Sequence, residues 1–139
     1  MPDDCIFCRI IRHEAPASIV HEAEHVVVFM SLHQFNAGHA LVVPREHIVN
    51  IYSLPDRLAG PLFAASARVA RAIKKAFQAD GVTIRQHNER AGGQEVMHLH
   101  VHVVPRYYED SGRPFPGLPA DRETLNRLAQ QLQAALVQN

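Results

Sequence analysis

Three histidines at alternate positions in one short segment carry the strongest chemical signal in this sequence. His98, His100 and His102 are separated by apolar residues. Because a β-strand sends alternate side chains to opposite faces, the spacing predicts that the three imidazoles line one face. The apolar residues of the segment are then predicted to enter the core: Leu99, Val101 and Val103. A row of imidazoles is an unfavourable way to fill a core, so the segment indicates binding of a metal or phosphate, or a nucleophile.

A polar, glycine-containing loop comes directly before the histidine segment. Gly92 and Gly93 allow backbone N–H groups to turn towards an anion, and Asn88 and Gln94 add neutral donors. The loop therefore predicts a phosphate-binding turn beside the imidazoles. An ordinary surface turn would have the same composition.

Two cysteines near the N-terminus form a Cys-x-x-Cys pair, Cys5 and Cys8. Two cysteines do not make a disulfide framework, so metal ligation or redox chemistry is the better question. His47 and one histidine of the alternating segment could complete a four-ligand zinc site, which would be structural because all positions are filled. The pair could also be two reduced cysteines without a metal.

The elements that must position these residues follow from hydrophobic periodicity. Short apolar runs predict strands, and apolar residues at helical spacing between Ser53 and Gly81 predict one long helix, with Ser53 as N-cap and Asp80-Gly81 at its end. The predicted strands span 19–21, 25–30, 39–44, 82–86 and the histidine segment up to about Pro105. Residues 109–119 are predicted to be irregular, and residues 121–137 to form a second helix. Short connections favour antiparallel pairing, so we expect an α+β domain with helices packed on one sheet.

Composition narrows the class of protein. The chain has 139 residues, enough for one domain, and 14 basic residues balance 14 acidic ones. This balance argues against binding to long nucleic acid, although one phosphate needs only a local group of donors. No apolar stretch reaches the length of a membrane span, and the acidic start Met1-Pro2-Asp3-Asp4 is unlike a secretory signal. We therefore expect no membrane partner and a cytoplasmic location.

The chain resembles the histidine triad (HIT) superfamily, in its Hint-like branch with a Cys-x-x-Cys start. The motif His-φ-His-φ-His-φ-φ matches residues 98–104, and flanking matches lie at 5–11, 38–47 and 91–96. The resemblance implies an antiparallel five-stranded sheet with one long helix packed on it and a C-terminal helix. It implies a HIT domain over residues 1–110, followed by a tail with a helix over residues 111–139.

The resemblance also implies roles for single residues. His100 would be the nucleophile that attacks the α-phosphorus of a purine nucleotide derivative, His102 would contact the phosphate, and His39 would support the catalysis. Zinc would be held as a structural ion by Cys5, Cys8, His47 and His98. Nucleotide and phosphate contacts, besides His100 and His102, would come from Ile6, Phe29, Ser31, Leu32, Asn88, Gly93, Gln94 and Val96. Expected partners are AMP, GMP and their conjugates, and a second copy of the chain, with the long helix or a sheet edge at the dimer interface.

The sequence departs from the family at Ser31, where relatives carry an acidic residue that holds the ribose hydroxyls. A serine hydroxyl bonds more weakly and without charge, so we expect weaker or altered ribose recognition. A second departure lies at residues Gln34, Phe35 and Asn36, where relatives carry a segment with proline. The tail from about Ser111 onward has no match in the family.

The leading function is hydrolysis of nucleoside phosphoramidates or related nucleotide conjugates through a nucleotidyl intermediate on His100. A dinucleoside polyphosphate hydrolase is the nearest alternative within the enzyme class. Two more distant hypotheses are a hydrolase with catalytic zinc on all three histidines of the motif and a nucleotide-binding protein with little turnover.

Overall fold

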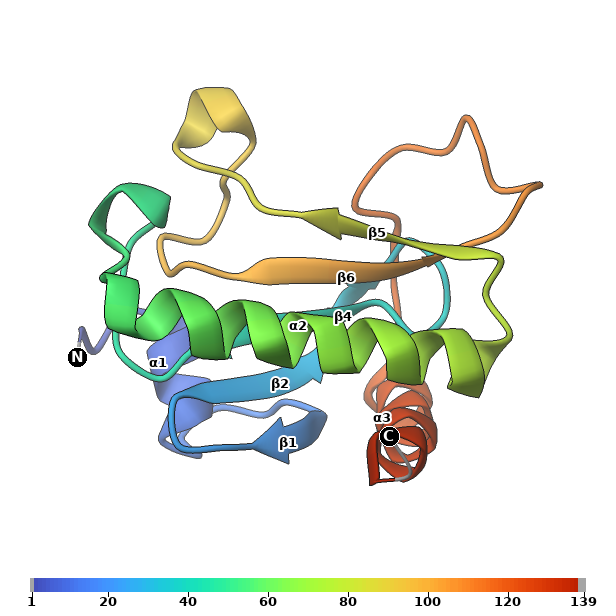
Figure 1. Cartoon of the computed structure of the whole chain (residues 1–139), viewed down its shortest axis with the longest axis horizontal. Coiled ribbons are helices and arrows are strands. Elements are labelled where there is room, and N and C mark those ends of the chain that lie inside the picture. The colour runs from blue at the N-terminus through green and yellow to red at the C-terminus, as the bar shows by residue number, and fades with distance from the viewer. Residues whose placement is uncertain (1, 138–139) are drawn as a thin grey trace.

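A five-stranded antiparallel sheet in the order β1-β2-β4-β6-β5 is the frame of this protein (Figure 1). The computed structural model describes residues 2–137. The elements in chain order are α1 (Ile6–Ile11), β1 (Ile19–Glu22), β2 (Val26–Met30), β3 (His33–Gln34), β4 (Ala40–Pro44), α2 (Asp56–Phe77), β5 (Gly81–Arg85), β6 (Val101–Arg106), β7 (Leu118–Pro119) and α3 (Arg122–Val137). Short 3₁₀ turns lie at Ile51–Ser53 and Arg90–Gly92, and β3 pairs with β7 in a separate two-stranded ribbon.

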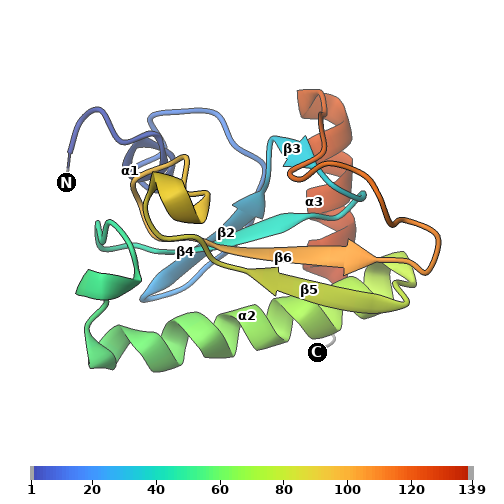
Figure 2. The same cartoon turned by 90° about the horizontal axis from the view of Figure 1, so that it is seen from above.

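The two faces of the sheet have separate apolar cores. Alternate residues of β2 and β4 point in opposite directions, so Val28 and Val42 pack with α2 and α3, whereas Phe29 and Leu41 pack with α1. Figure 2 shows α2 along one side of the sheet and α1 on the other. Helix α3 packs against α2 and against β1 and β2. The α+β class and the antiparallel five-stranded sheet are therefore as predicted.

The long helix is shifted at both ends from its predicted bounds. Pro55 is its N-cap residue, while Ser53 ends the preceding 3₁₀ turn, which Asn50 caps through a bond from Tyr52 N–H. The helix ends before Gln78, a non-glycine residue in the left-handed conformation. Ser53 as N-cap and Asp80-Gly81 as helix end were therefore wrong.

The histidine segment is only partly a strand. Strand β6 begins at Val101, so His98 and His100 lie in the approach to it, where Leu99 N–H donates to Ile48 O at 2.6 Å instead of joining the sheet. The alternation nevertheless holds through the segment. The apolar partners Leu99, Val101 and Val103 are buried in the core beneath α2.

Three further elements were not expected from the sequence. Helix α1 begins directly after Cys5 and includes Cys8, and the paired short strands β3 and β7 lie where no strand was predicted. Within residues 2–137, no helix is long and apolar enough to cross a membrane.

Candidate functional site

A cleft of about 640 Å³ lies on the α1 side of the sheet, with His100 and His102 in its wall. Its apolar lining comes from α1, β2 and β4, and includes Phe7, Ile10 and Leu41. Eight of the predicted nucleotide-binding residues line it: Ile6, Phe29, Ser31, Leu32, Gly93, Val96, His100 and His102. The cleft therefore brings residues near the N-terminus and residues of the glycine loop together around the two imidazoles.

His100 has one ring nitrogen fixed and one available. Its Nδ1 lies 2.7 Å from the carbonyl oxygen of His98, and a carbonyl only accepts, so Nδ1 carries the proton. The Nε2 atom then has a lone pair, and among the described residues no hydrogen-bond partner is found for it. Phe7 packs edge-on against the ring, with the centroids 5.1 Å apart. This arrangement presents a neutral imidazole nitrogen to the cleft.

His102 and His39 form a second hydrogen-bonded unit behind the first. Phe35 N–H donates to Nδ1 of His39 at 3.2 Å, so His39 must carry its proton on Nε2. That Nε2–H lies 2.9 Å from Nδ1 of His102 and donates to it. The remaining proton of His102 is then on Nε2, which makes His102 a hydrogen-bond donor towards the cleft.

The meeting of His39 and His102 follows from the strand register. Leu41 on β4 pairs with His102 on β6, and His39 lies two residues before Leu41, on the same face of the sheet. His39 is fully buried, so it is not itself a wall of the cleft. Its place in the site is as the partner that fixes the tautomer of His102.

Burial keeps these rings neutral. Desolvation, reinforced by Arg85 and neighbouring histidines, lowers the pKa of His39 to about 3. Desolvation and the nearby imidazoles lower the pKa of His102 to about 2. The pKa of His100 is also below its ordinary value, mainly by desolvation, although the His98 carbonyl partly offsets this. At neutral pH the neutral ring is therefore the dominant form of His100.

Two predicted phosphate contacts are placed elsewhere. The Gln94 side chain is buried and holds the loop together, donating to Val49 O at 2.7 Å and accepting from Glu89 N–H at 2.8 Å. Asn88 accepts from Ile51 N–H at 2.9 Å. Gln94 and Asn88 do not line the cleft; their side chains bond within and next to the glycine loop. Gly92 and Gly93 of the same loop do line the cleft.

Several cleft residues were not predicted from the sequence, among them Arg85, His87, Phe115 and Arg122. Phe115 comes from the tail, and its ring lies 5.0 Å from that of His102. The Arg85 guanidinium stacks on Phe115 at 3.8 Å from the ring centroid. The tail therefore forms one wall of the cleft. No local sequence pattern pointed to these residues, because the contacts join segments far apart in the chain.

Gln34 is a further residue that the sequence did not mark as functional. Its amide nitrogen donates to Ser31 O at 2.7 Å and His39 O at 2.8 Å, and its amide oxygen accepts from the backbone N–H groups of Gly38 and His39. The side chain thereby fastens the loop that carries His39. It occupies part of the segment where relatives were expected to carry proline.

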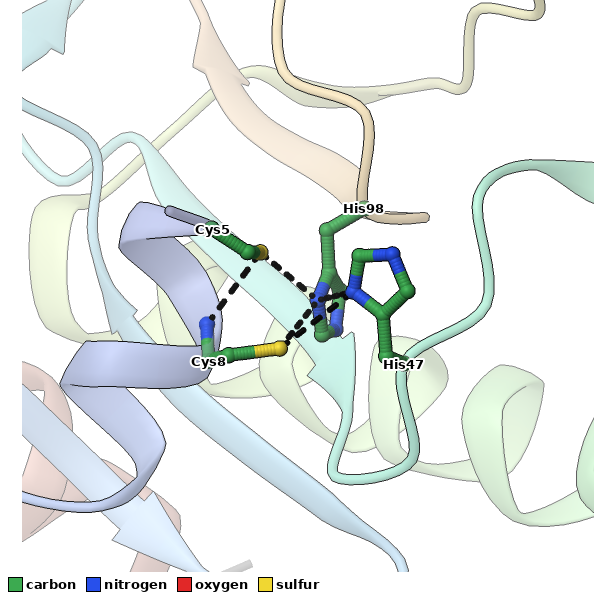
Figure 3. A group of neighbouring side chains, drawn as sticks. All are labelled: Cys5, Cys8, His47 and His98. Carbon is green, nitrogen blue, oxygen red and sulfur yellow. Dashed lines mark hydrogen bonds between the residues drawn. The ribbon is translucent and has the colours of Figure 1, made fainter. Parts of the chain in front are cut away.

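A cluster of four possible metal ligands lies at the start of α1 (Figure 3). Cys5 is the N-cap residue of α1 and accepts from Cys8 N–H at 3.4 Å, so one helical turn brings both sulfurs together. Cys8 Sγ lies 3.3 Å from His47 Nδ1, and Cys5 Sγ lies 3.4 Å from His98 Nδ1. The two Nδ1 atoms are 3.2 Å apart.

The donor set fits a tetrahedral metal ion. With zinc–ligand bonds of about 2.0–2.3 Å, ligand atoms should be separated by about 3.3–3.8 Å, close to the separations seen here. His98 Nε2 donates to Pro44 O at 2.9 Å, which leaves its Nδ1 lone pair facing the cluster. Burial and the adjacent Cys5 raise the pKa of Cys8 to about 11, and a bound cation would offset this cost by favouring the thiolate.

The HIT domain model matches residues 12–109, so the chain belongs to the HIT domain family. It is 31% identical to adenosine 5'-monophosphoramidase HNT1 of Saccharomyces cerevisiae over 134 residues, which is 95% of this chain and 82% of that protein.

Two solved structures are close over nearly the whole chain. A HIT-like protein from Bartonella henselae has a TM-score of 0.90 at 36% identity, covering 97% of this chain and 98% of that one. A Zn-bound histidine triad family protein from Mycobacterium smegmatis has a TM-score of 0.87 at 33% identity, covering 97% and 94%. The predicted family is therefore confirmed.

Proposed function

We propose that this protein is a nucleotide-binding hydrolase that cleaves nucleoside 5'-phosphoramidates, or related conjugates, at the α-phosphorus through a nucleotidyl intermediate on His100. The observation that carries the proposal is the neutral His100 ring. Its Nδ1–H is fixed on His98 O, and its Nε2 is left for attack within the cleft. The similarity to a yeast adenosine 5'-monophosphoramidase supports the same reaction class.

The reaction takes place in two displacements at phosphorus. His100 Nε2 forms a bond to the α-phosphorus as the bond to the leaving amine or oxygen breaks, and the leaving group takes up a proton from water. The His98 carbonyl, which accepts from Nδ1–H, stabilises the positive charge that develops on the ring. Water then attacks the same phosphorus, the P–N bond to His100 breaks, and the nucleoside monophosphate and a proton are released.

His102 is proposed to bind the phosphoryl group as a donor. Its Nε2–H follows from the chain of bonds that starts at Phe35 N–H and passes through His39. A neutral ring with so low a pKa donates a hydrogen bond to a phosphoryl oxygen or to the leaving atom. His39 is a positioning residue, since it acts through His102.

The remaining contacts follow the chemistry of the walls. Ile6 and Phe29 belong to the apolar wall and would pack against a purine, while Ser31 and Leu32 would lie beside the ribose. Backbone groups at Gly93 and Val96 would line the phosphate end. AMP, GMP and their conjugates are the proposed ligands.

The metal is proposed to be zinc, held by the four-ligand cluster and structural in role. All four positions belong to the protein, which is typical of zinc that ties chain segments together. Here the cluster joins α1, the loop after β4 and the start of the histidine segment. Because His98 turns its ring towards the cysteines, the three histidines of the motif do not form a common site, which disfavours catalytic zinc on all three.

A dinucleoside polyphosphate is the second candidate substrate. Arg85 places a guanidinium in the cleft beside Phe115, where further phosphates of a leaving group could pair with it. Comparing the kcat/KM of a nucleoside phosphoramidate with that of a dinucleoside tetraphosphate would decide between the two.

A homodimer is proposed through β5 or α2. Strand β5 is an edge of the sheet and exposes Ile84, and α2 exposes Phe63. Sedimentation of the chain and of an Ile84→Glu variant would test this. The boundary at residue 110 and the cytoplasmic location also stay predictions.

The test of the activity is covalent labelling. The purified protein is incubated with an adenosine 5'-phosphoramidate labelled at the phosphorus, quenched in base, and examined for protein-bound label. We expect label and turnover in the wild-type protein and in His21→Ala, which alters an exposed histidine. His100→Ala should lose both while keeping its circular dichroism and melting temperature. Full turnover in His100→Ala would refute the mechanism.

A further inference from the structure

Ser31 and Arg122 come from distant parts of the chain and line the same cleft. Three hydrogen bonds hold their segments side by side. Ala120 N–H donates to Leu32 O at 3.0 Å, next to Ser31. Arg122 Nη1 donates to Ser18 Oγ at 2.8 Å, and Ser18 O accepts from Met30 N–H at 3.0 Å. Ser31 and Arg122 thus lie on neighbouring segments just beyond the end of β2 and line the same cleft.

The guanidinium of Arg122 has N–H donors that are not used in hydrogen bonds among the described residues. Among the described residues its hydrogen-bond acceptor is Ser18 Oγ, which in turn donates to Asn126 Oδ1 at 2.6 Å, and no carboxylate lies within ion-pair distance of it. The neighbouring Asp121 carboxylate accepts from Thr124 N–H at the start of α3. Because a guanidinium offers five N–H donors, most of them remain for a ligand.

The proposed function decides which part of a nucleotide meets this pair. If the α-phosphorus lies at His100 and the base against the apolar wall with Phe29, the ribose hydroxyls are the polar groups left to face Ser31 and Arg122. A carboxylate in such a position binds free hydroxyls and repels a phosphate, whereas an arginine accommodates a phosphorylated ribose. A serine hydroxyl adds a neutral donor that does not repel the anion.

We propose that Ser31 and Arg122 form a binding site for a phosphate on the ribose of the bound nucleotide. The preferred substrate class is then a nucleoside 5'-conjugate that carries a second phosphate at its 2'- or 3'-position. This inference rests on the nucleotide-binding part of the proposed function. It competes with a purely structural role, in which Arg122 only fastens α3 to Ser18.

The test compares the binding of AMP, adenosine 2',5'-bisphosphate and adenosine 3',5'-bisphosphate by calorimetry. We expect one bisphosphate to bind the wild-type protein about ten- to a hundredfold more tightly than AMP, the effect of one charge-assisted contact. Arg122→Gln should remove this preference while changing the affinity for AMP less than about threefold. Ser31→Asp should invert it. Melting curves of each variant exclude unfolding as the cause.

A matched control separates a specific contact from the general positive charge of the cleft. Arg85 also lines the cleft, but it stacks on Phe115. Arg85→Gln should therefore weaken all three ligands and leave the ratio between bisphosphate and AMP unchanged. Equal affinity for AMP and both bisphosphates in the wild-type protein would overturn the inference. So would an affinity ratio between bisphosphate and AMP that is unchanged in Arg122→Gln, or one that is lost to the same extent in Arg85→Gln.

The outcomes also separate this inference from the hydrolase proposal. Binding needs no turnover, so an Arg122-dependent preference in a protein that never forms labelled His100 would refute the hydrolase alone. A protein that is labelled and active but shows no preference would refute the ribose-phosphate site alone. Failure to bind any of the three nucleotides would refute both.

Discussion

Acid should destabilise this protein through the two rings that share a hydrogen bond, His39 and His102. Both are buried, and in the folded protein the pKa of His39 is about 3 and that of His102 about 2. In the unfolded chain each titrates near the ordinary value of about 6.5. Between these limits the unfolded state binds more protons than the folded state, so the free energy of unfolding falls as the pH falls below about 6.5.

The size of the effect follows from proton linkage. At about pH 5 a histidine with a pKa near 6.5 in the unfolded chain binds a proton, whereas the folded ring stays neutral. This proton binding stabilises the unfolded state by about 2 kcal/mol for each such ring. His39 and His102 together then lower the free energy of unfolding by about 4 kcal/mol relative to about pH 7.5. This is a large part of the roughly 5–15 kcal/mol typical of a domain.

The assay is urea unfolding at a series of pH values, for the wild-type protein and for His39→Gln. Glutamine can still donate to His102 Nδ1 but does not titrate. The slope of unfolding free energy against pH, measured below about pH 6, should be smaller in the variant by about 1.4 kcal/mol per pH unit. Contributions from the metal-ligand cluster are common to both proteins and cancel in the difference. Equal slopes, or NMR titration of His39 near its ordinary pKa of about 6.5, would refute the reasoning.

Three further outcomes are expected. Removing the metal with a chelator should lower the melting temperature and slow nucleotide transfer to His100 without stopping it. Elemental analysis checks the metal content, melting curves the stability, and covalent labelling the rate of transfer. Gln94→Leu should lower the free energy of unfolding by about 3 kcal/mol in urea, because the buried Gln94 amide loses its hydrogen bonds to partners such as Glu89 N–H and Val49 O. Phe115→Ala should weaken AMP binding about fivefold by calorimetry, because the wall beside His102 opens to water and Arg85 loses its ring contact.

Periodicity in the sequence was sufficient to predict the sheet and both long helices, because each buries a regular apolar face. Val28 and Val42 face one core and Phe29 and Leu41 the other, as strand alternation requires. The helix ends were mispredicted because their caps depend on context. The Asn50 side chain caps a 3₁₀ turn that includes Ser53, and Gln78 adopts the left-handed conformation without being glycine.

The candidate site was predictable where chemistry and sequence spacing coincide, and not elsewhere. His100, His102 and the four-ligand cluster are marked by residue type and motif. Arg85, Phe115 and Arg122 are not, since each reaches the cleft only through tertiary packing of the tail and of β5. Gln94 is the opposite case, a residue that the motif marked but that does not line the cleft. Its position beside the glycines suggested a phosphate contact, but its amide is used within the protein.

His98 joins the metal-ligand cluster to the proposed nucleophile within one residue. Its ring contributes Nδ1 to the cluster and donates from Nε2 to Pro44 O, while its backbone carbonyl accepts from His100 Nδ1–H. A shift of the His98 backbone would therefore weaken the bond that keeps the lone pair of His100 on Nε2. The cluster can influence the rate without contacting the substrate, because it fixes the carbonyl that sets the tautomer of the attacking ring. For the same reason, loss of the metal should lower kcat more than it raises KM, whereas a metal at the reacting phosphate would affect both.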